Sequence, residues 1–244
     1  MNMKHFLLPA FLLLVLTGMA QNTPPKKKDK SKPKIDLTGR SNDHLLLQVG
    51  YTQWANLPDT LSTSGLSKSF NGYVMFDFPF KNDPRLSMAF GPGIGSDHIL
   101  FTKRSIGIKE LTPTLRFTNV QDTNHYKKSK LATVYLEAPI ELRFNKNPDK
   151  NNGFKWAIGM KVGTLLNAHT RNTKWQNRSG NLLNNYVMKE SSKRFFNRTR
   201  LVAQARVGLG HISLYGSYQL TTVIKDGFGP AVRPLTIGLT ISGL

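Results

Sequence analysis

Residues Lys130 to Phe144, KLATVYLEAPIELRF, alternate almost without interruption between apolar and mostly polar side chains. Successive side chains of a β-strand point to opposite faces, so this stretch predicts one strand with two contrasting faces. One face is wholly apolar and consists of Ala132, Val134, Leu136, Ala138, Ile140, Leu142 and Phe144. The other carries Thr133, Tyr135, Glu137, Pro139, Glu141 and Arg143. The fold has to cover a long apolar face and accommodate an ionic one.

The same period of two recurs from residue 45 to the end of the chain. It predicts eight strands, at 45–52, 70–80, 86–95, 130–144, 154–163, 201–209, 211–220 and 235–242. Short connections at 81–84, 145–153 and Gly210 alternate with longer ones at 56–68, 96–129, 164–197 and 222–232. An even number of strands with short turns at one end and long loops at the other is typical of a barrel that crosses a membrane. The sequence therefore predicts an all-β fold, a closed antiparallel transmembrane β-barrel.

Two alternatives to eight membrane-crossing strands follow from the same residues. A soluble β-sandwich also alternates, but it turns its apolar face inward and rarely keeps charged side chains along the middle of the other face. In hydrocarbon, by contrast, only closure removes the edges of a sheet, and the apolar face meets lipid. The segment SIGIKELTPTLRFT, residues 105–118, could add one hairpin and raise the count to ten strands.

The first forty residues carry signals for export. Residues 1–20 combine Lys4, an apolar run at 6–16 and small residues before Gln21, which predicts a signal peptide cleaved between Ala20 and Gln21. The run is shorter than the roughly 20 residues of a membrane-spanning helix. Residues 21–40 hold seven basic and two acidic residues and no apolar period, so we expect a basic, disordered periplasmic tail. The barrel domain then covers 41–244.

Charge points to partners in the cell envelope. Thirty-four basic against fourteen acidic residues give a formal net charge of +20. Export argues against nucleic acid, so the basic clusters at 97–130 and 167–200 are expected to meet outer-membrane lipid, lipopolysaccharide phosphates or an acidic protein of the periplasm or cell surface, although a solvated surface without a partner explains them equally well. The expected location is the cell outer membrane, with the long loops extracellular and both mature ends periplasmic.

Charged residues on the inner faces of the strands form the candidate site. Aligning Phe144 with Phe154 would set Glu137 opposite Lys161, where the two could pair. The interior of an eight-stranded barrel is only wide enough to be filled by side chains, so we expect a structural network that plugs it. Its predicted members are Asp77, Glu137, Glu141, Arg143, Lys155, Lys161 and Arg206.

The sequence offers little chemistry beyond this network. Glycines alternate in FGPGIGS, residues 90–96, but no helix follows them, so crowding inside a narrow barrel explains them better than a dinucleotide site. Asp97 and His98 are adjacent on a strand and so point to opposite faces. The chain has no cysteine, and its six histidines lack metal-ligand spacing. We expect no catalytic residue, metal or cofactor. The function predicted is a non-enzymatic envelope or partner-binding protein; the alternatives are a small porin-like channel and a hydrolase at the barrel mouth.

Four stretches carry a resemblance to a known family. KLATVYLEAPIELRF, GPGIGSDHI, GHISLYGSYQLTTVIK and RPLTIGLTISGL resemble the PorT-like outer-membrane β-barrel family of Gram-negative bacteria, over residues 41–244. The resemblance implies a small outer-membrane barrel. It also implies that the expected binding of a partner could serve an accessory role in protein secretion.

Overall fold

The computed structural model describes residues 44–58, 61, 63, 66–101, 103–148 and 153–243. The chain divides into two units, Met1–Thr38 and Gly39–Leu244, and every described residue belongs to the second. The predicted signal peptide, its cleavage site at Ala20 and Gln21, and the basic tail at 21–40 lie outside the described residues.

All regular secondary structure in the described residues is β-strand. In this part of the chain, no helix is long and apolar enough to cross a membrane. The strands are β1 (Leu45–Ala55), β2 (Lys68–Val74), β3 (Phe76–Pro79), β4 (Leu86–Phe90), β5 (Gly93–Phe101), β6 (Arg104–Ile106), β7 (Phe117–Asn119), β8 (His125–Asn145), β9 (Phe154–Gln176), β10 (Leu182–Ser191), β11 (Thr199–Leu209), β12 (Ile212–Gln219) and β13 (Arg233–Ser242).

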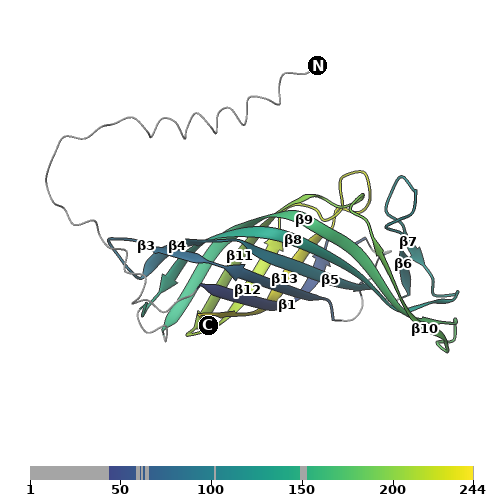
Figure 1. The fold of residues 1–244 in the computed structure, drawn as a ribbon, viewed down its shortest axis with the longest axis horizontal. Coiled ribbons are helices and arrows are strands. Elements are labelled where there is room, and N and C mark those ends of the chain that lie inside the picture. The colour runs from purple at the N-terminus through teal and green to yellow at the C-terminus, as the bar shows by residue number, and fades with distance from the viewer. Residues whose placement is uncertain are drawn as a thin grey trace, which may run out of the picture. The chain divides into compact units, whose positions relative to one another are not determined.

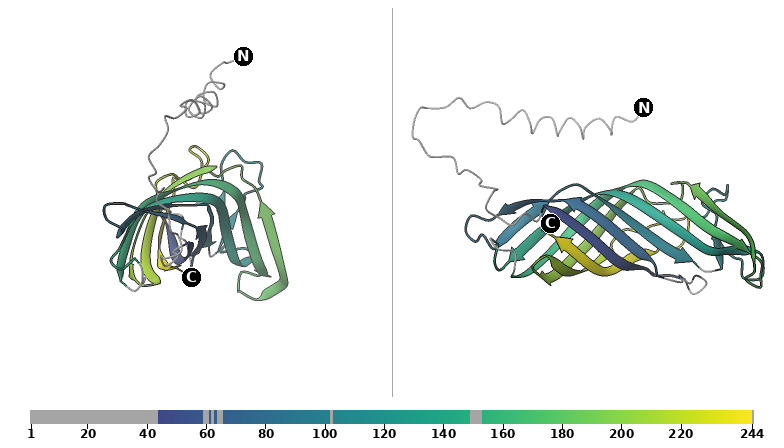
Figure 2. Two further views of the ribbon diagram at one scale, coloured as in Figure 1. Left: turned by 60° about the vertical axis from the view of Figure 1, so that its left-hand side comes forward. Right: turned by 60° about the horizontal axis from the view of Figure 1, so that its bottom comes forward.

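The strands pair antiparallel in one large sheet. Its order is β10-β9-β11-β12-β13-β1-β2-β5-β8-β4-β3, and β8 also pairs with β9. Each of the strands β1, β2, β5, β8, β9, β11, β12 and β13 consequently has at least two antiparallel neighbours, and β8 and β9 each have three. Figure 2 shows these strands curving around a common interior, and Figure 1 shows β8 and β9 as the longest ribbons.

Two of the predicted strands are each interrupted once. The second prediction, 70–80, is divided at Met75 into β2 and β3, and the third is divided at Gly91 and Pro92 into β4 and β5. Proline has no N–H to give to a ladder, and a Cβ on Gly91 would overlap the carbonyl of Val74. The interruption is bridged by a bond from the N–H of Val74 to the carbonyl of Pro92, at 2.9 Å.

The two faces of the large sheet differ as the alternation predicts. On β8 the outward Leu136 is 45% exposed, whereas the next residue, the inward Glu137, is 2% exposed. Outward residues on the other strands are likewise apolar, for example Phe70, Ile158 and Ile237, all exposed. The outer face of the sheet is thus largely apolar and the buried charged groups lie inside it, the reverse of a soluble domain.

The two ends of the sheet differ in their connections. At one end lie the turn 80–85, the turn after Asn145, and Gly210, whose φ of 57° suits a residue without a side chain. In the first of these turns, the side-chain hydrogen bond from Arg85 lowers the pKa of Asp83. Aromatic rings stack beside these turns, Phe78 on Phe90 at 5.1 Å and Phe144 on Trp156 at 5.9 Å. Longer connections lie at the opposite end.

The structure adds a β-extension that the sequence did not predict. β8 begins at His125 instead of Lys130, and β9 continues to Gln176, where a loop was expected. β10 then pairs with the distal part of β9 (Figure 1). The segment 105–118 contributes to β6 and β7, which pair only with each other in a separate two-stranded sheet. The hairpin of β6 and β7 therefore does not join the large sheet. The predicted alternative, in which this hairpin raises the number of barrel strands to ten, is wrong.

The predicted register between β8 and β9 is wrong by two residues. Phe144 lies opposite Trp156, not Phe154, and Glu137 lies opposite Gly163. Lys161 lies opposite Pro139. A shift of two keeps every side chain on its own face, so the hydrophobic pattern alone cannot detect it.

Candidate functional site

Arg200 is the centre of a buried charged cluster inside the sheet. Its guanidinium forms an ion pair with the carboxylate of Glu137, through both Nε and Nη2, and donates to Asp97 Oδ2 at 2.6 Å. Arg200 comes from β11, Glu137 from β8 and Asp97 from β5. All three side chains are buried. A charge-assisted, two-pronged contact of this kind fixes the direction of the guanidinium plane.

Tyr73 joins Lys161 to the same cluster. The Tyr73 hydroxyl donates to Glu137 Oε2 at 2.5 Å and accepts from Lys161 Nζ at 3.1 Å. Glu137 and Lys161 are thus linked through a phenol rather than directly paired, which corrects the predicted contact. Two carboxylates and two cations balance in charge, as burial of ionised groups requires.

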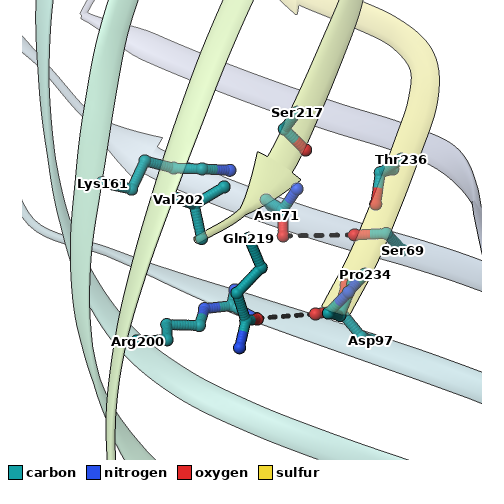
Figure 3. Close-up of a pocket in the computed structure, with 10 residues that line it drawn as sticks. All are labelled: Ser69, Asn71, Asp97, Lys161, Arg200, Val202, Ser217, Gln219, Pro234 and Thr236. Atoms are coloured by element: carbon teal, nitrogen blue, oxygen red, sulfur yellow. Dashed lines mark hydrogen bonds and ion pairs between the residues drawn. The ribbon is translucent and has the colours of Figure 1, made fainter. Parts of the chain in front are cut away.

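Little free space remains around this cluster. Figure 3 shows Lys161, Arg200 and Asp97 lining one interior pocket. Its volume is ≈ 10 Å³, close to what a single water molecule needs. The pocket is also lined by Ser69, Asn71, Val202, Ser217, Gln219, Pro234 and Thr236.

A second charged cluster lies nearer the short turns. Glu141 accepts from Arg143 Nε at 2.7 Å, from Arg206 at 3.1 Å and from Gln204 at 2.9 Å. Asp77, half-buried, accepts from Ser87 at 2.7 Å and lies 3.8 Å from Arg143 Nη1.

The seven predicted network residues therefore fall into different places. Glu137 and Lys161 belong to the Arg200 cluster, and Glu141, Arg143, Arg206 and Asp77 to the second. Lys155 is buried and donates to Ser242 Oγ at 2.8 Å.

The sequence pattern did not identify Arg200 and Tyr73 as members of the charged network, and it did not place Asp97 in that network. Arg200 lies one residue before the predicted sixth strand, but it has the same parity as Val202, Gln204 and Arg206 on the inner face. Extending the strand by one residue would have included it.

Alternate glycines make room for the cluster. A Cβ on Gly95 would run into Arg200 and Glu137, and one on Gly93 would run into the Tyr73 ring. FGPGIGS therefore runs from the last residue of β4 through Gly91 and Pro92 into β5, and Gly93 and Gly95 relieve crowding, as expected from the sequence.

An apolar cluster fills the interior toward the long connections. Trp54 of β1, Phe101 of β5 and Tyr135 of β8 meet residues of the loops, with Trp54 and Phe101 edge to face at 5.5 Å. The loop residues are buried, and the N–H of Leu115 and of Lys225 bond the carbonyls of Phe228 and Phe195. The buried loop members, including those of β6, are Ile106, Ile108, Leu115, Phe195, Phe196, Val223, Ile224 and Val232. We call this set the loop core.

Asp97 and His98 point to opposite faces of the sheet, as their adjacent positions on a strand predict. Asp97 points inward to Arg200, while the His98 ring packs against the outward Phe70 at 6.0 Å. His98 Nε2 lies 3.0 Å from Ser96 Oγ. Among the described residues, no group of three or more histidine, aspartate or glutamate side chains is placed to hold a metal ion.

Comparison with known proteins gives one family and a few solved structures. A comparison with curated proteins finds no match. Ail, the attachment invasion locus protein of Yersinia pestis, in complex with the heparin analogue sucrose octasulfate, is 12% identical with a TM-score of 0.35, covering 81% of this chain and 96% of that one. A second structure of Ail gives 13% identity and a TM-score of 0.33, covering 81% and 95% of the two chains.

The family described as "Outer membrane protein beta-barrel domain" matches residues 19–221, well over half of the chain. The match agrees with the antiparallel all-β sheet, its apolar outer face and its ionic interior. This chain belongs to the outer membrane protein beta-barrel domain family.

Proposed function

We propose that the protein is a closed, eight-stranded outer-membrane barrel without a conducting pore, which holds a β-sheet platform for binding partners in the envelope. The platform consists of β10 and the parts of β8 and β9 beyond Ser129 and Asn172, away from the short turns. The observation that carries the proposal is that three layers of side chains fill the interior of the barrel one after another.

Three layers succeed one another along the inner face of β8. Arg143 and Glu141 belong to the charged cluster near the short turns, Glu137 to the Arg200 cluster, and Tyr135 and Leu131 to the apolar cluster that also contains the loop core. The Arg200 guanidinium lies over the Tyr135 ring at 4.1 Å, so the second and third layers are in contact. In the part of the chain that the structure describes, paired charges followed by packed apolar side chains fill the interior, which argues against the porin-like alternative.

Closure and membrane insertion have separate support. At least two antiparallel neighbours for each of the eight strands satisfy the backbone groups that hydrocarbon cannot. On β8, the outward residues from Phe144 to Ala132 are all apolar. They span about 40 Å along the strand, or about 28 Å across a membrane at the usual 45° tilt, which matches a hydrocarbon core.

Orientation follows the usual arrangement of such barrels. Short turns are periplasmic and long loops extracellular. The first described residue, His44, bonds to Met75, and Ser242 bonds to the carbonyl of His211, both at the short-turn end. Both ends of the barrel are thus periplasmic, and the platform is at the cell surface.

The partners proposed are lipid and lipopolysaccharide phosphates around the barrel and a protein of the surface or periplasm. The PorT-like resemblance makes an accessory role in protein secretion one form of the protein contact. Enzymatic activity has no support, because Asp97 is occupied by Arg200 and His98 is on the other face.

Single-channel recording in planar bilayers tests the absence of a pore. The purified full-length protein is expected to give no steps in conductance. A variant that lacks the loop residues 193–198 and 222–232 tests whether the Arg200 cluster alone blocks ions. Reproducible conductance by the wild-type protein would refute the proposal. The platform is tested by a variant in which Asn-Gly replaces residues 172–188. This two-residue turn joins Arg171 to Lys189, which are already opposite one another in the pairing of β9 with β10. The variant should no longer crosslink to a partner at the cell surface.

A further inference from the structure

Three cationic side chains lie in one row across β8, β9 and β10. Lys130 of β8 is directly opposite Arg171 of β9, and Arg171 is directly opposite Lys189 of β10. Side chains opposite one another in an antiparallel pair have Cβ atoms about 5 Å apart, and like charges there are destabilising. Arg171 and Lys189 are exposed, and Lys130 is half-buried.

The row lies on the outer face of the sheet. The neighbours of opposite parity, Ser129, Leu131 and Asn172, are buried on the inner face, where Ser129 donates to Asn172 at 2.7 Å. Val134 and Leu136 of β8 point to the same face as Lys130 and belong to the apolar outer face of the sheet. The basic row therefore continues the outer, apolar face.

No described carboxylate neutralises the row. Glu190 follows Lys189 on β10 but lies opposite Thr170, which is buried on the inner face. The side chains next to the row on the outer face are neutral or basic, namely Lys128, Thr173, Val187, His169 and Ser191. Repulsion within the row thus favours an anion from outside the chain.

The height of the row indicates what kind of anion is nearby. Going up β8 from the short turns, Lys130 is the first outward charged residue after the apolar stretch that begins at Phe144. On β9, Arg171 is the first outward residue with a permanent charge after Ile158, Met160 and Val162. Both cations are consequently placed just beyond the hydrocarbon, at the level of lipid headgroups.

We propose that Lys130, Arg171 and Lys189 bind the phosphate groups of a phosphorylated glycolipid in the leaflet around the barrel. The assignment rests on the proposed outer-membrane placement. Arg171, in the centre, offers a planar fork whose N–H groups can donate to two phosphate oxygens, and the flanking lysines add flexible point charges. The row spans about 10 Å across three strands, enough to bridge two phosphates of one headgroup or of two neighbours.

The test uses the full-length protein in detergent micelles with bisphosphorylated lipid A as the probe, followed by native mass spectrometry. The triple variant Lys130→Gln, Arg171→Gln and Lys189→Gln is expected to bind about a hundredfold more weakly than wild type. A matched control removes three exposed cations from the neighbouring loop, Lys103→Gln, Lys109→Gln and Arg116→Gln, and should bind as wild type does. Cooperative unfolding of both variants, followed by tryptophan fluorescence, shows that each is folded.

Further arms separate the source of the phosphate and the role of the fork. Dephosphorylated lipid A should bind no better to wild type than to the triple variant, and free pyrophosphate should not compete. Arg171→Lys should retain more binding than Arg171→Gln. Equal loss in the control triple, equal binding of the dephosphorylated lipid, or competition by free pyrophosphate would overturn the glycolipid site. If the wild-type protein conducts ions but still binds lipid A through the row, only the proposal of a barrel without a pore is overturned. If the wild-type protein shows no conductance and its binding of lipid A does not depend on the row, only the glycolipid site is overturned.

Discussion

Glu137 and Arg200 form their ion pair across Gly163, which lies directly opposite both of them. β9 lies between β8 and β11, and Gly163 is paired with Glu137 on one side and with Arg200 on the other. A Cβ on Gly163 would come within 3.1 Å of Glu137 Cγ and 3.2 Å of Arg200 Cγ. The glycine therefore lets the two side chains meet above the intervening strand, in an interior too narrow for a third side chain.

Replacing Arg200 with Met is expected to lower the free energy of unfolding by about 3–5 kcal/mol, because it leaves Glu137 and Asp97 buried without their cation. Equilibrium unfolding in urea from lipid vesicles measures the change. The exposed pair of Arg85 and Asp83 serves as control, and Arg85→Gln should leave the free energy of unfolding nearly unchanged, because water and salt screen exposed ion pairs. Equal losses for the two variants would show that burial of the Arg200 cluster has no energetic consequence.

Exchanging the charges of Glu137 and Lys161 is expected not to rescue stability. The double variant Glu137→Lys, Lys161→Glu sets a lysine against Arg200, since Arg200 and not Lys161 is the ion-pair partner of Glu137. It should unfold at least as readily as Glu137→Lys alone in the same urea assay. By contrast, Tyr73→Phe breaks the link between the two residues and should cost about 1–3 kcal/mol. Recovery of stability in the swapped variant would mean that Glu137 and Lys161 act as a direct pair.

The sequence predicts the faces of the strands better than it predicts their register. Alternation assigned Glu137, Glu141, Arg143 and Lys161 to the inner face, where they are buried. The register of β8 against β9 was wrong because a shift of two residues preserves that assignment, and only the geometry of the turn between them decides it.

Two parts of the structure have no periodic signal in the sequence. The platform strands beyond Ser129 and Asn172 have polar residues on both faces, so no apolar face marks them as strands. The loop core consists of residues such as Ile108, Phe195 and Ile224, which lie far apart in irregular segments and meet only when the loops fold inward. Neither part could be recognised from alternation.

Opening the loop core is expected to loosen the long connections and leave the sheet intact. Phe195→Ala and Phe196→Ala each remove a fully buried ring, and each should cost the loop core about 3–5 kcal/mol. Hydrogen exchange should then become faster at Asn197, whose N–H bonds the carbonyl of Val223, and at Val223, whose N–H bonds the carbonyl of Val232, and stay unchanged at Leu239 in β13. Uniformly faster exchange along β13 would show instead that the loop core and the sheet unfold as one unit.

Adding a single methyl group at Gly95 is expected to destabilise the interior. The Cβ of Gly95→Ala would overlap the Arg200 guanidinium and the Glu137 carboxylate, so one of the two has to leave its position and the free energy of unfolding should fall by about 1–3 kcal/mol. Gly216→Ala is the matched control, because nothing lies within 4 Å of the position its Cβ would take. That variant should be unchanged or slightly more stable, since alanine restricts the unfolded chain. Urea unfolding of the two variants in parallel measures the difference, and similar stabilities for both would show that the Arg200 cluster yields to an added methyl group without cost.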